Sequence, residues 1–135
     1  MEKRFLVAVY GSLMQGLHNH NYLEDSKLKG SFVTEPIYTL VDLGSFPGLY
    51  ENGTTSINME VYEVDEHTLA NLDILEGYDE TNDDLSMYIR TSISTPFGIA
   101  FIYLYNDNIE NKKPILSGDW REHLMFKKNL EKYVC

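Results

Sequence analysis

The amino-acid sequence predicts an α+β fold, in which short strands form a small mixed or closed β-barrel accompanied by helices. Two observations predict it. Apolar runs typical of strands outnumber helical segments along the chain. Most of these strands are joined by short turns and not by regular helical crossovers, which disfavours a doubly wound parallel sheet. We expect one domain, residues 1–135, because this length buries a hydrophobic core without further staples.

The charge balance restricts the partners. There are 21 acidic and 11 basic residues, a net charge of −10. Binding to nucleic acid or to an anionic membrane relies on neutralising phosphates, so we expect neither partner. The N-terminal apolar run is too short for a signal sequence, which predicts a cytoplasmic protein. The single cysteine, Cys135, gives no disulfide framework. Length and charge suit a monomer, although an exposed apolar patch would allow a dimer.

The first strand delivers a candidate binding loop. The apolar run Phe5 to Val9 ends abruptly in Tyr10-Gly11-Ser12-Leu13. A buried strand followed by small residues places backbone N–H groups where a ligand can accept their hydrogen bonds. We therefore interpret Tyr10 to Leu13 as a loop that receives a substrate.

The next segments predict a loop or short helix over residues 17–28 and then strands between Gly30 and Asp42 that are interrupted at Pro36. Asn52-Gly53 precedes the alternating strand Ile57 to Val64. Both turn residues tolerate positive φ, which predicts a type I′ hairpin at this point.

The clearest helix runs from Asp65 to Glu76. Asp65 is a suitable N-cap, leucines recur at helical spacing, and Gly77 is a suitable C-terminal cap. An acidic loop follows at residues 78–84, and then two strands, 87–94 and 99–105, joined by a Pro/Gly turn. A second helix is predicted over residues 121–133.

Other chemistries find weaker support. Gly11 and Gly16 have the spacing of a phosphate loop, but Leu17 and His18 stand where such a loop needs lysine and a hydroxyl. His18 and His20 form an H-x-H pair without a second cluster, which indicates solvated or hydrogen-bonded histidines more than a metal site. Ser12 lacks the G-x-S-x-G elbow of a serine hydrolase, which favours a role for its backbone amide.

Glu76 is the main acidic candidate. A carboxylate at a helix C-terminus faces the unfavourable end of the helix dipole, and the acidic run Asp79, Glu80, Asp83 and Asp84 lies just beyond it. Both effects raise a carboxyl pKa, and a raised pKa makes a better proton acceptor near neutral pH. The alternative is an ordinary solvated carboxylate on a helix.

Taken in order, several motifs resemble one family. They are Tyr10-Gly11-Ser12-Leu13, Gly16, Asn19-His20, Glu60-Val61-Tyr62-Glu63-Val64, Leu72-Asp73-x-Leu75-Glu76-Gly77-Tyr78 and Tyr88-x-Arg90. The set is similar to the gamma-glutamylcyclotransferase-like family, and most of all to its gamma-glutamylamine cyclotransferase branch.

The resemblance implies a small mixed β-barrel with flanking helices. It also implies a reaction in which the α-amine of a small γ-glutamyl compound attacks its own γ-carbonyl and releases 5-oxoproline. Glu76 matches the general base of the family, Tyr10, Gly11, Ser12 and Leu13 match its γ-glutamyl-binding segment, and Tyr88 matches a pocket tyrosine. No metal or organic cofactor is implied. The alternative is a non-catalytic small-molecule binding or regulatory protein on the same fold.

Overall fold

The computed structural model describes residues 3–131. Its strands are β1 (Arg4–Val9), β2 (Lys27–Val33), β3 (Tyr38–Asp42), β4 (Pro47–Thr55), β5 (Asn58–Asp65), β6 (Tyr88–Thr95), β7 (Gly98–Tyr105) and β8 (Lys113–Pro114). Its α-helices are α1 (Glu66–Leu75) and α2 (Trp120–Glu131), and short 3₁₀ turns occur at η1 (His20–Leu23) and η2 (Asp83–Leu85).

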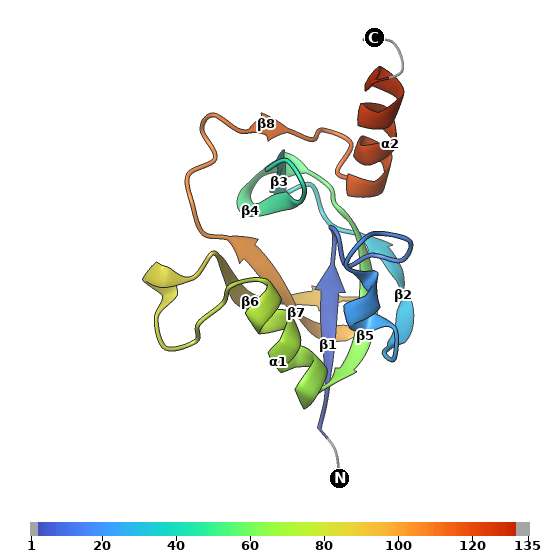
Figure 1. Ribbon diagram of the computed structural model, residues 1–135, viewed down its shortest axis with the longest axis vertical. Helices are drawn as coiled ribbons and strands as arrows, with labels where there is room; N and C mark the ends of the chain where they lie inside the picture. Colours follow the sequence, from blue (N-terminus) through green and yellow to red (C-terminus); the bar gives the residue numbers. More distant parts are fainter. Residues whose placement is uncertain (1–2, 132–135) are drawn as a thin grey trace.

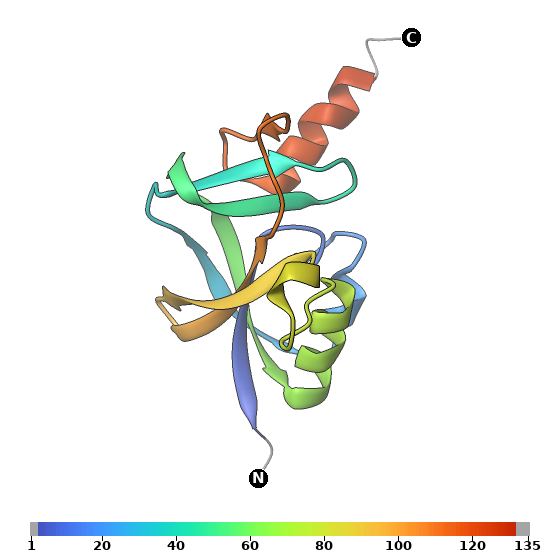
Figure 2. The ribbon, with the colours of Figure 1, turned by 90° about the vertical axis from the view of Figure 1, so that its left-hand side faces the viewer.

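The strands form two sheets. The larger has the order β2-β5-β1-β7-β6, and the smaller has the order β4-β3-β8. β1 lies at the centre of the larger sheet, antiparallel to β5 and parallel to β7, and its residues Val7, Ala8 and Val9 are buried. Figures 1 and 2 show the small sheet lying across one end of the large sheet, with α2 beyond it. The end of β1 therefore points at the place where the sheets meet.

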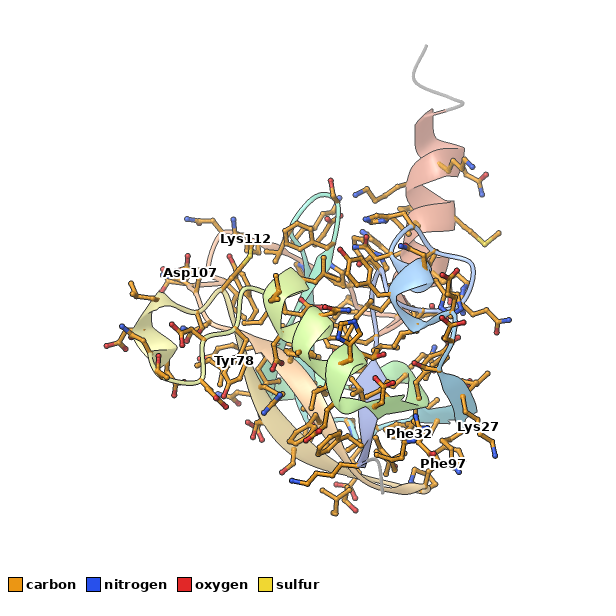
Figure 3. The ribbon with its side chains drawn as sticks, turned by 60° about the horizontal axis from the view of Figure 1, so that its bottom comes forward. Lys27, Phe32, Tyr78, Phe97, Asp107 and Lys112 are labelled. Atoms are coloured by element: carbon orange, nitrogen blue, oxygen red, sulfur yellow. The ribbon has the colours of Figure 1, made fainter. Side chains whose placement is uncertain are left out.

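The predicted closed barrel is wrong, because the two sheets do not join into one. β2 and β6 are the opposite edges of the large sheet, and β3 pairs with β4 and β8 instead of bridging those edges. Closure requires an unbroken ladder of hydrogen bonds around the sheet. Instead, the side chain of Phe97, at the β6–β7 turn, packs onto Gly30 of β2, and Figure 3 shows it at the same edge of the molecule as Phe32.

The predicted hairpin at Asn52-Gly53 is also wrong. Both residues lie inside β4, which pairs with β3 and not with β5. The register jumps between the pairs Thr39↔Tyr50 and Tyr38↔Thr55, so the intervening residues of β4 bulge out of the ladder. Gly53 fits here because a side chain would collide with Thr39 and with the Tyr38 backbone. The glycine serves a close approach of two strands and not a reversal of the chain.

The predicted first helix and last hairpin are confirmed. The Asp65 side chain caps α1 by accepting a hydrogen bond of 2.8 Å from the Thr68 amide. Gly77 follows the helix with φ of +65°, a conformation that favours glycine. β6 and β7 pair in continuous register from Tyr88↔Tyr105 to Thr95↔Gly98. These elements place Glu76 and Tyr88 near the junction of the sheets.

α2 is anchored at its first turn. Trp120 is fully buried, and the Asp119 carboxylate accepts hydrogen bonds from the Glu122 amide and from Asn58 on β5. The second predicted helix is thus confirmed as far as the described residues extend, and Cys135 lies outside them. Within residues 3–131, neither α-helix is long and apolar enough to cross a membrane.

Candidate active site

A small cavity of about 30 Å³ lies where the sheets meet. The end of β1 and its loop, the start of β4, the end of α1 and the strands β6 and β7 all contribute to its wall. The lining residues are Ala8, Val9, Tyr10, Gly11, Ser12, Phe46, Pro47, Glu76, Tyr88 and Tyr103.

Most of the residues singled out from the sequence meet in this cavity. Tyr10, Gly11, Ser12, Glu76 and Tyr88 all line it. Leu13 does not: its side chain lies in the hydrophobic core, and its carbonyl is 3.0 Å from Nδ1 of His20. The roles assigned to these residues stay predictions.

Glu76 is held at the end of α1. Its amide donates a 2.9 Å hydrogen bond to the carbonyl of Leu72, and Gly77 then turns the chain away. Burial raises the pKa of the Glu76 carboxyl from 4.5 to about 7, because the charged form loses hydration. The pKa of Glu76 is thus raised, as the sequence predicts, but by burial and not by the acidic run.

The acidic run contributes no resolved effect to the pKa of Glu76. Asp79, Glu80, Asp83 and Asp84 are exposed to solvent, where water and salt screen their charges. Burial is the cause that accounts for the raised pKa of Glu76. The electrostatic explanation drawn from the sequence is replaced by desolvation.

Buried tyrosines surround the carboxyl group. The hydroxyl of Tyr10 donates to the carbonyl of Tyr103 at 2.6 Å, and that of Tyr88 donates to the carbonyl of Pro47 at 2.7 Å. Burial, and then neighbouring groups that include Glu76, raise the pKa values of Tyr10 and Tyr88 above the ordinary value. These hydroxyls therefore stay neutral, and Glu76 is the lining group that titrates near neutral pH.

The loop after β1 offers backbone donors. Among residues 3–131, the amides of Gly11, Ser12 and Leu13 donate to no other group of the protein. Gly11 and Leu13 are buried residues and Ser12 is half-buried. Amides without a partner in the protein are free to donate to water or to a ligand. The loop is fixed by other bonds: the Met14 amide donates to Gly11, and the Asn19 side chain donates to Ser12 Oγ.

Three lining residues were not predicted as site residues: Phe46, Pro47 and Tyr103. Tyr103 could have been found from the hairpin register, since it pairs with Arg90 and so shares a face with Tyr88. Its hydroxyl donates to Asp73 on α1 at 2.7 Å, and Arg90 binds the same carboxylate at 2.6 Å. Phe46 and Pro47 come from the other sheet, and no local pattern links them to Glu76.

The histidines do not assemble a metal site. His18 is exposed, His20 bonds the Leu13 carbonyl, and His123 lies 2.8 Å from Asp42. Within the described residues there is no group of three or more His, Cys, Asp or Glu side chains placed to hold an ion. The cavity wall instead offers one titratable carboxyl and a set of neutral donors.

The cavity thus brings together the Glu76 carboxyl group and the loop after β1, at the place where the two sheets meet. Residues 7–122 match the family described as gamma-glutamyl cyclotransferase, AIG2-like, and the chain belongs to that family. The resemblance inferred from the ordered motifs is confirmed.

Individual relatives agree with this assignment. A Vibrio cholerae protein, provisionally named a gamma-glutamylcyclotransferase, is 52% identical over 115 residues, covering 85% of this chain and 94% of its own. The solution structure of YtfP from Escherichia coli, a gamma-glutamylcyclotransferase family protein by name, has a TM-score of 0.69 and 36% identity over 88% of this chain and 98% of its own. A Niallia circulans protein named gamma-L-glutamyl-butirosin B gamma-glutamyl cyclotransferase is 32% identical, covering 85% of this chain and 74% of its own length.

Proposed function

We propose that this protein is a cyclotransferase that converts a γ-glutamyl amine or a related small γ-glutamyl compound to 5-oxoproline and a free amine. One observation carries the proposal. The Glu76 carboxyl, whose pKa burial raises to about 7, lines the same cavity as the Tyr10-Gly11-Ser12 loop. A proton acceptor poised near neutral pH and a set of anion-binding amides are the two components that this reaction needs.

Glu76 is the proposed proton carrier. The α-ammonium group of the substrate has to lose a proton before its nitrogen can attack, and the Glu76 carboxylate accepts that proton. The nitrogen then forms a bond to the γ-carbonyl carbon, the five-membered ring closes, and the bond from that carbon to the leaving amine breaks. The protonated Glu76 gives its proton to the departing nitrogen. The second proton, which the attacking nitrogen loses as the ring closes, leaves on the released amine as its ammonium form, so the enzyme ends as it began. Because ring closure is intramolecular, the protein contributes mainly positioning.

The loop amides are the proposed anion-binding groups. Neither lysine nor arginine occurs among the residues described as lining the cavity. Amides of Gly11, Ser12 and Leu13 supply donors without adding a formal charge, and they can hold either the substrate carboxylate or the oxyanion that develops on the γ-carbonyl oxygen. The family membership and the name of the Niallia circulans relative support a γ-glutamyl substrate.

Release of 5-oxoproline from a panel of γ-glutamyl compounds tests the proposal. We expect turnover by the wild type, and a fall of about 10²- to 10⁴-fold in Glu76→Gln, because removal of a general base has effects of this size. Glu80→Gln, at an exposed position in the following loop, is the matched control and should keep full activity. Equal turnover by Glu76→Gln contradicts the proposed base. Calorimetric binding without turnover on the whole panel favours the non-catalytic binding protein instead.

A further inference from the structure

The cavity is narrow for the proposed substrate. Its volume is about 30 Å³, whereas a γ-glutamyl group has ten or so non-hydrogen atoms. The position of each wall therefore matters for what the cavity admits. The loop after β1 is fixed by several hydrogen bonds, and Glu76 is fixed in the last turn of α1. One further wall is the β3–β4 turn, residues 43–46, which carries Phe46 and leads into Pro47.

This turn has few restraints of its own. Gly44 and Ser45 are exposed and Phe46 is half-buried. A single hydrogen bond of 3.0 Å from the Leu43 amide to the Phe46 carbonyl closes the turn, and Gly44 has φ of +107°, which glycine adopts at low cost. Apart from the packing of Leu43 and Phe46 against the core, the turn is therefore held by the contacts at its base.

Two side chains of α2 hold that base. His123 Nε2 and Lys127 Nζ lie 2.8 and 3.0 Å from the same oxygen of Asp42, the last residue of β3. Lys127 also donates to the carbonyl of Gly44 at 3.2 Å, and the second Asp42 oxygen accepts from the Gly44 amide at 2.7 Å. Although partial burial acts to raise the pKa of Asp42, the hydrogen bonds from His123, Gly44 and Lys127 lower it below the usual value. The Asp42 carboxylate is therefore charged at neutral pH, and both of its oxygens accept hydrogen bonds.

α2 can serve as a fixed support for these contacts. Trp120 is fully buried at the start of the helix and stacks on the ring of His123, with ring centroids 5.6 Å apart. The Lys127 ammonium lies 5.7 Å from the Trp120 ring centroid. Figure 2 shows the helix leaving the small sheet at the side away from the large one. A continuous set of contacts thus runs from α2 through Asp42 and Gly44 to the wall of the cavity.

We propose that His123 and Lys127 are positioning residues, which hold the β3–β4 turn in place and thereby set how far Phe46 and Pro47 close the cavity over Glu76. They touch neither the substrate nor the reacting atoms. The catalytic consequence rests on the proposed function, whereas the effect on the Glu76 environment does not.

Loss of the contacts that His123 and Lys127 make with Asp42 and Gly44 is expected to expose Glu76 to water. The other titratable groups that face Glu76 are Tyr10 on β1, Tyr88 on β6 and Tyr103 on β7. Tyr88 also contacts the wall itself, through its hydrogen bond to the Pro47 carbonyl and its ring beside Phe46. The pKa values of all three tyrosines are raised above the ordinary value, so their hydroxyls are neutral near pH 7. A lower pKa of Glu76 then reports that water has entered as the wall retracts.

The test is an NMR titration of the Glu76 side-chain carboxyl carbon, which needs neither substrate nor activity. In Lys127→Ala we expect the pKa of Glu76 to fall by about 0.5 to 1 from its wild-type value, because partial rehydration reverses part of the desolvation. Lys127→Arg, which keeps the charge and the donors, should restore most of the wild-type pKa. Lys128→Ala, at the exposed neighbouring position, is the matched control and should leave it unchanged. An unchanged pKa in folded Lys127→Ala overturns the proposal.

A second variant covers the case in which Lys127→Ala does not fold. His123→Phe keeps a ring against Trp120 and removes the donor to Asp42, so the same fall in the pKa of Glu76 is expected. On an active substrate, the acid limb of kcat/KM should move to lower pH by the amount seen in the titration. A wild type that releases no 5-oxoproline contradicts the proposed function, while the carboxyl titration still decides whether α2 controls the wall.

Discussion

Glu76 shows how a reactive group costs stability at the scale of one residue. A carboxyl whose pKa is about 7 in the folded protein and 4.5 when hydrated binds its proton more tightly in the folded state. Its stabilising contribution is complete below pH 4.5 and is lost as pH rises through 7. At higher pH the folded protein holds a poorly hydrated negative charge. Ionised Glu76 therefore lowers the stability of the folded protein at the pH at which the base is needed.

Glu76→Gln should therefore stabilise the protein at alkaline pH. At pH 8 we expect a gain of about 1 to 3 kcal/mol in the free energy of unfolding, since each unit of pKa corresponds to about 1.4 kcal/mol and glutamine keeps part of the burial cost. At pH 4 the gain should nearly vanish. Urea unfolding at both pH values measures it. A gain of equal size at the two pH values would show that Glu76 is not the group responsible.

The acidic run allows a second prediction at this scale. Burial raises the pKa of Glu76, and the charges of Asp79, Glu80, Asp83 and Asp84 are exposed and screened. Neutralising these four residues together should therefore move the acid limb of the rate profile by less than about 0.3 pH unit. The measurement is kcat/KM against pH at 20 and 200 mM salt. A clear move to lower pH at low salt would restore the electrostatic role suggested by the sequence.

At the scale of elements, what could be predicted depends on whether the signal is local. Asp65, the leucines of α1 and Gly77 act within a few residues of one another, so their pattern predicts the helix. Asn52-Gly53 carries an equally strong local signal, yet β4 continues through it because the strand pairs with β3. Whether a glycine is needed for a turn or for a close approach depends on the neighbouring strand, which the local sequence does not contain.

Helix α1 is tied to the β6–β7 hairpin by Asp73. This carboxylate accepts from Arg90 at 2.6 Å and from Tyr103 at 2.7 Å, and the Arg90 guanidinium also lies over the Phe101 ring. Asp73→Ala leaves a largely buried guanidinium without its partner, so we expect a loss of about 1 to 3 kcal/mol in unfolding free energy. Glu66→Ala on the same helix removes only an exposed 4.0 Å pair with Lys3 and should cost less than about 0.5 kcal/mol. Comparable losses in the two variants would argue against a structural role for Asp73.

At the scale of the whole molecule, the site exists because two sheets meet. The β1 loop, α1 and the β6–β7 hairpin belong to the large sheet or its connections, whereas Phe46 and Pro47 belong to the small sheet. Gly11 permits this meeting, since a Cβ there would lie 2.8 Å from the Pro47 ring. The sequence identifies the half of the site that its motifs contain. It does not identify the Phe46–Pro47 wall, because that wall arises from how the sheets dock.

The hydrogen bond from Tyr88 to the Pro47 carbonyl should couple the two sheets. It is buried and joins β6 to the start of β4 over 2.7 Å. Tyr88→Phe leaves that carbonyl without its donor, so we expect a loss of about 1 kcal/mol in unfolding free energy, while the exposed Tyr22→Phe should change it by less than about 0.5 kcal/mol. Because the sheets share the site and one core, both variants should still unfold in a single urea transition, followed in parallel by Trp120 fluorescence beside the small sheet and by circular dichroism. Two separated transitions in Tyr88→Phe, with Trp120 reporting the earlier one, would show that this hydrogen bond is the main link between the sheets. A single transition at the wild-type midpoint would show that the docking of the sheets does not depend on this bond.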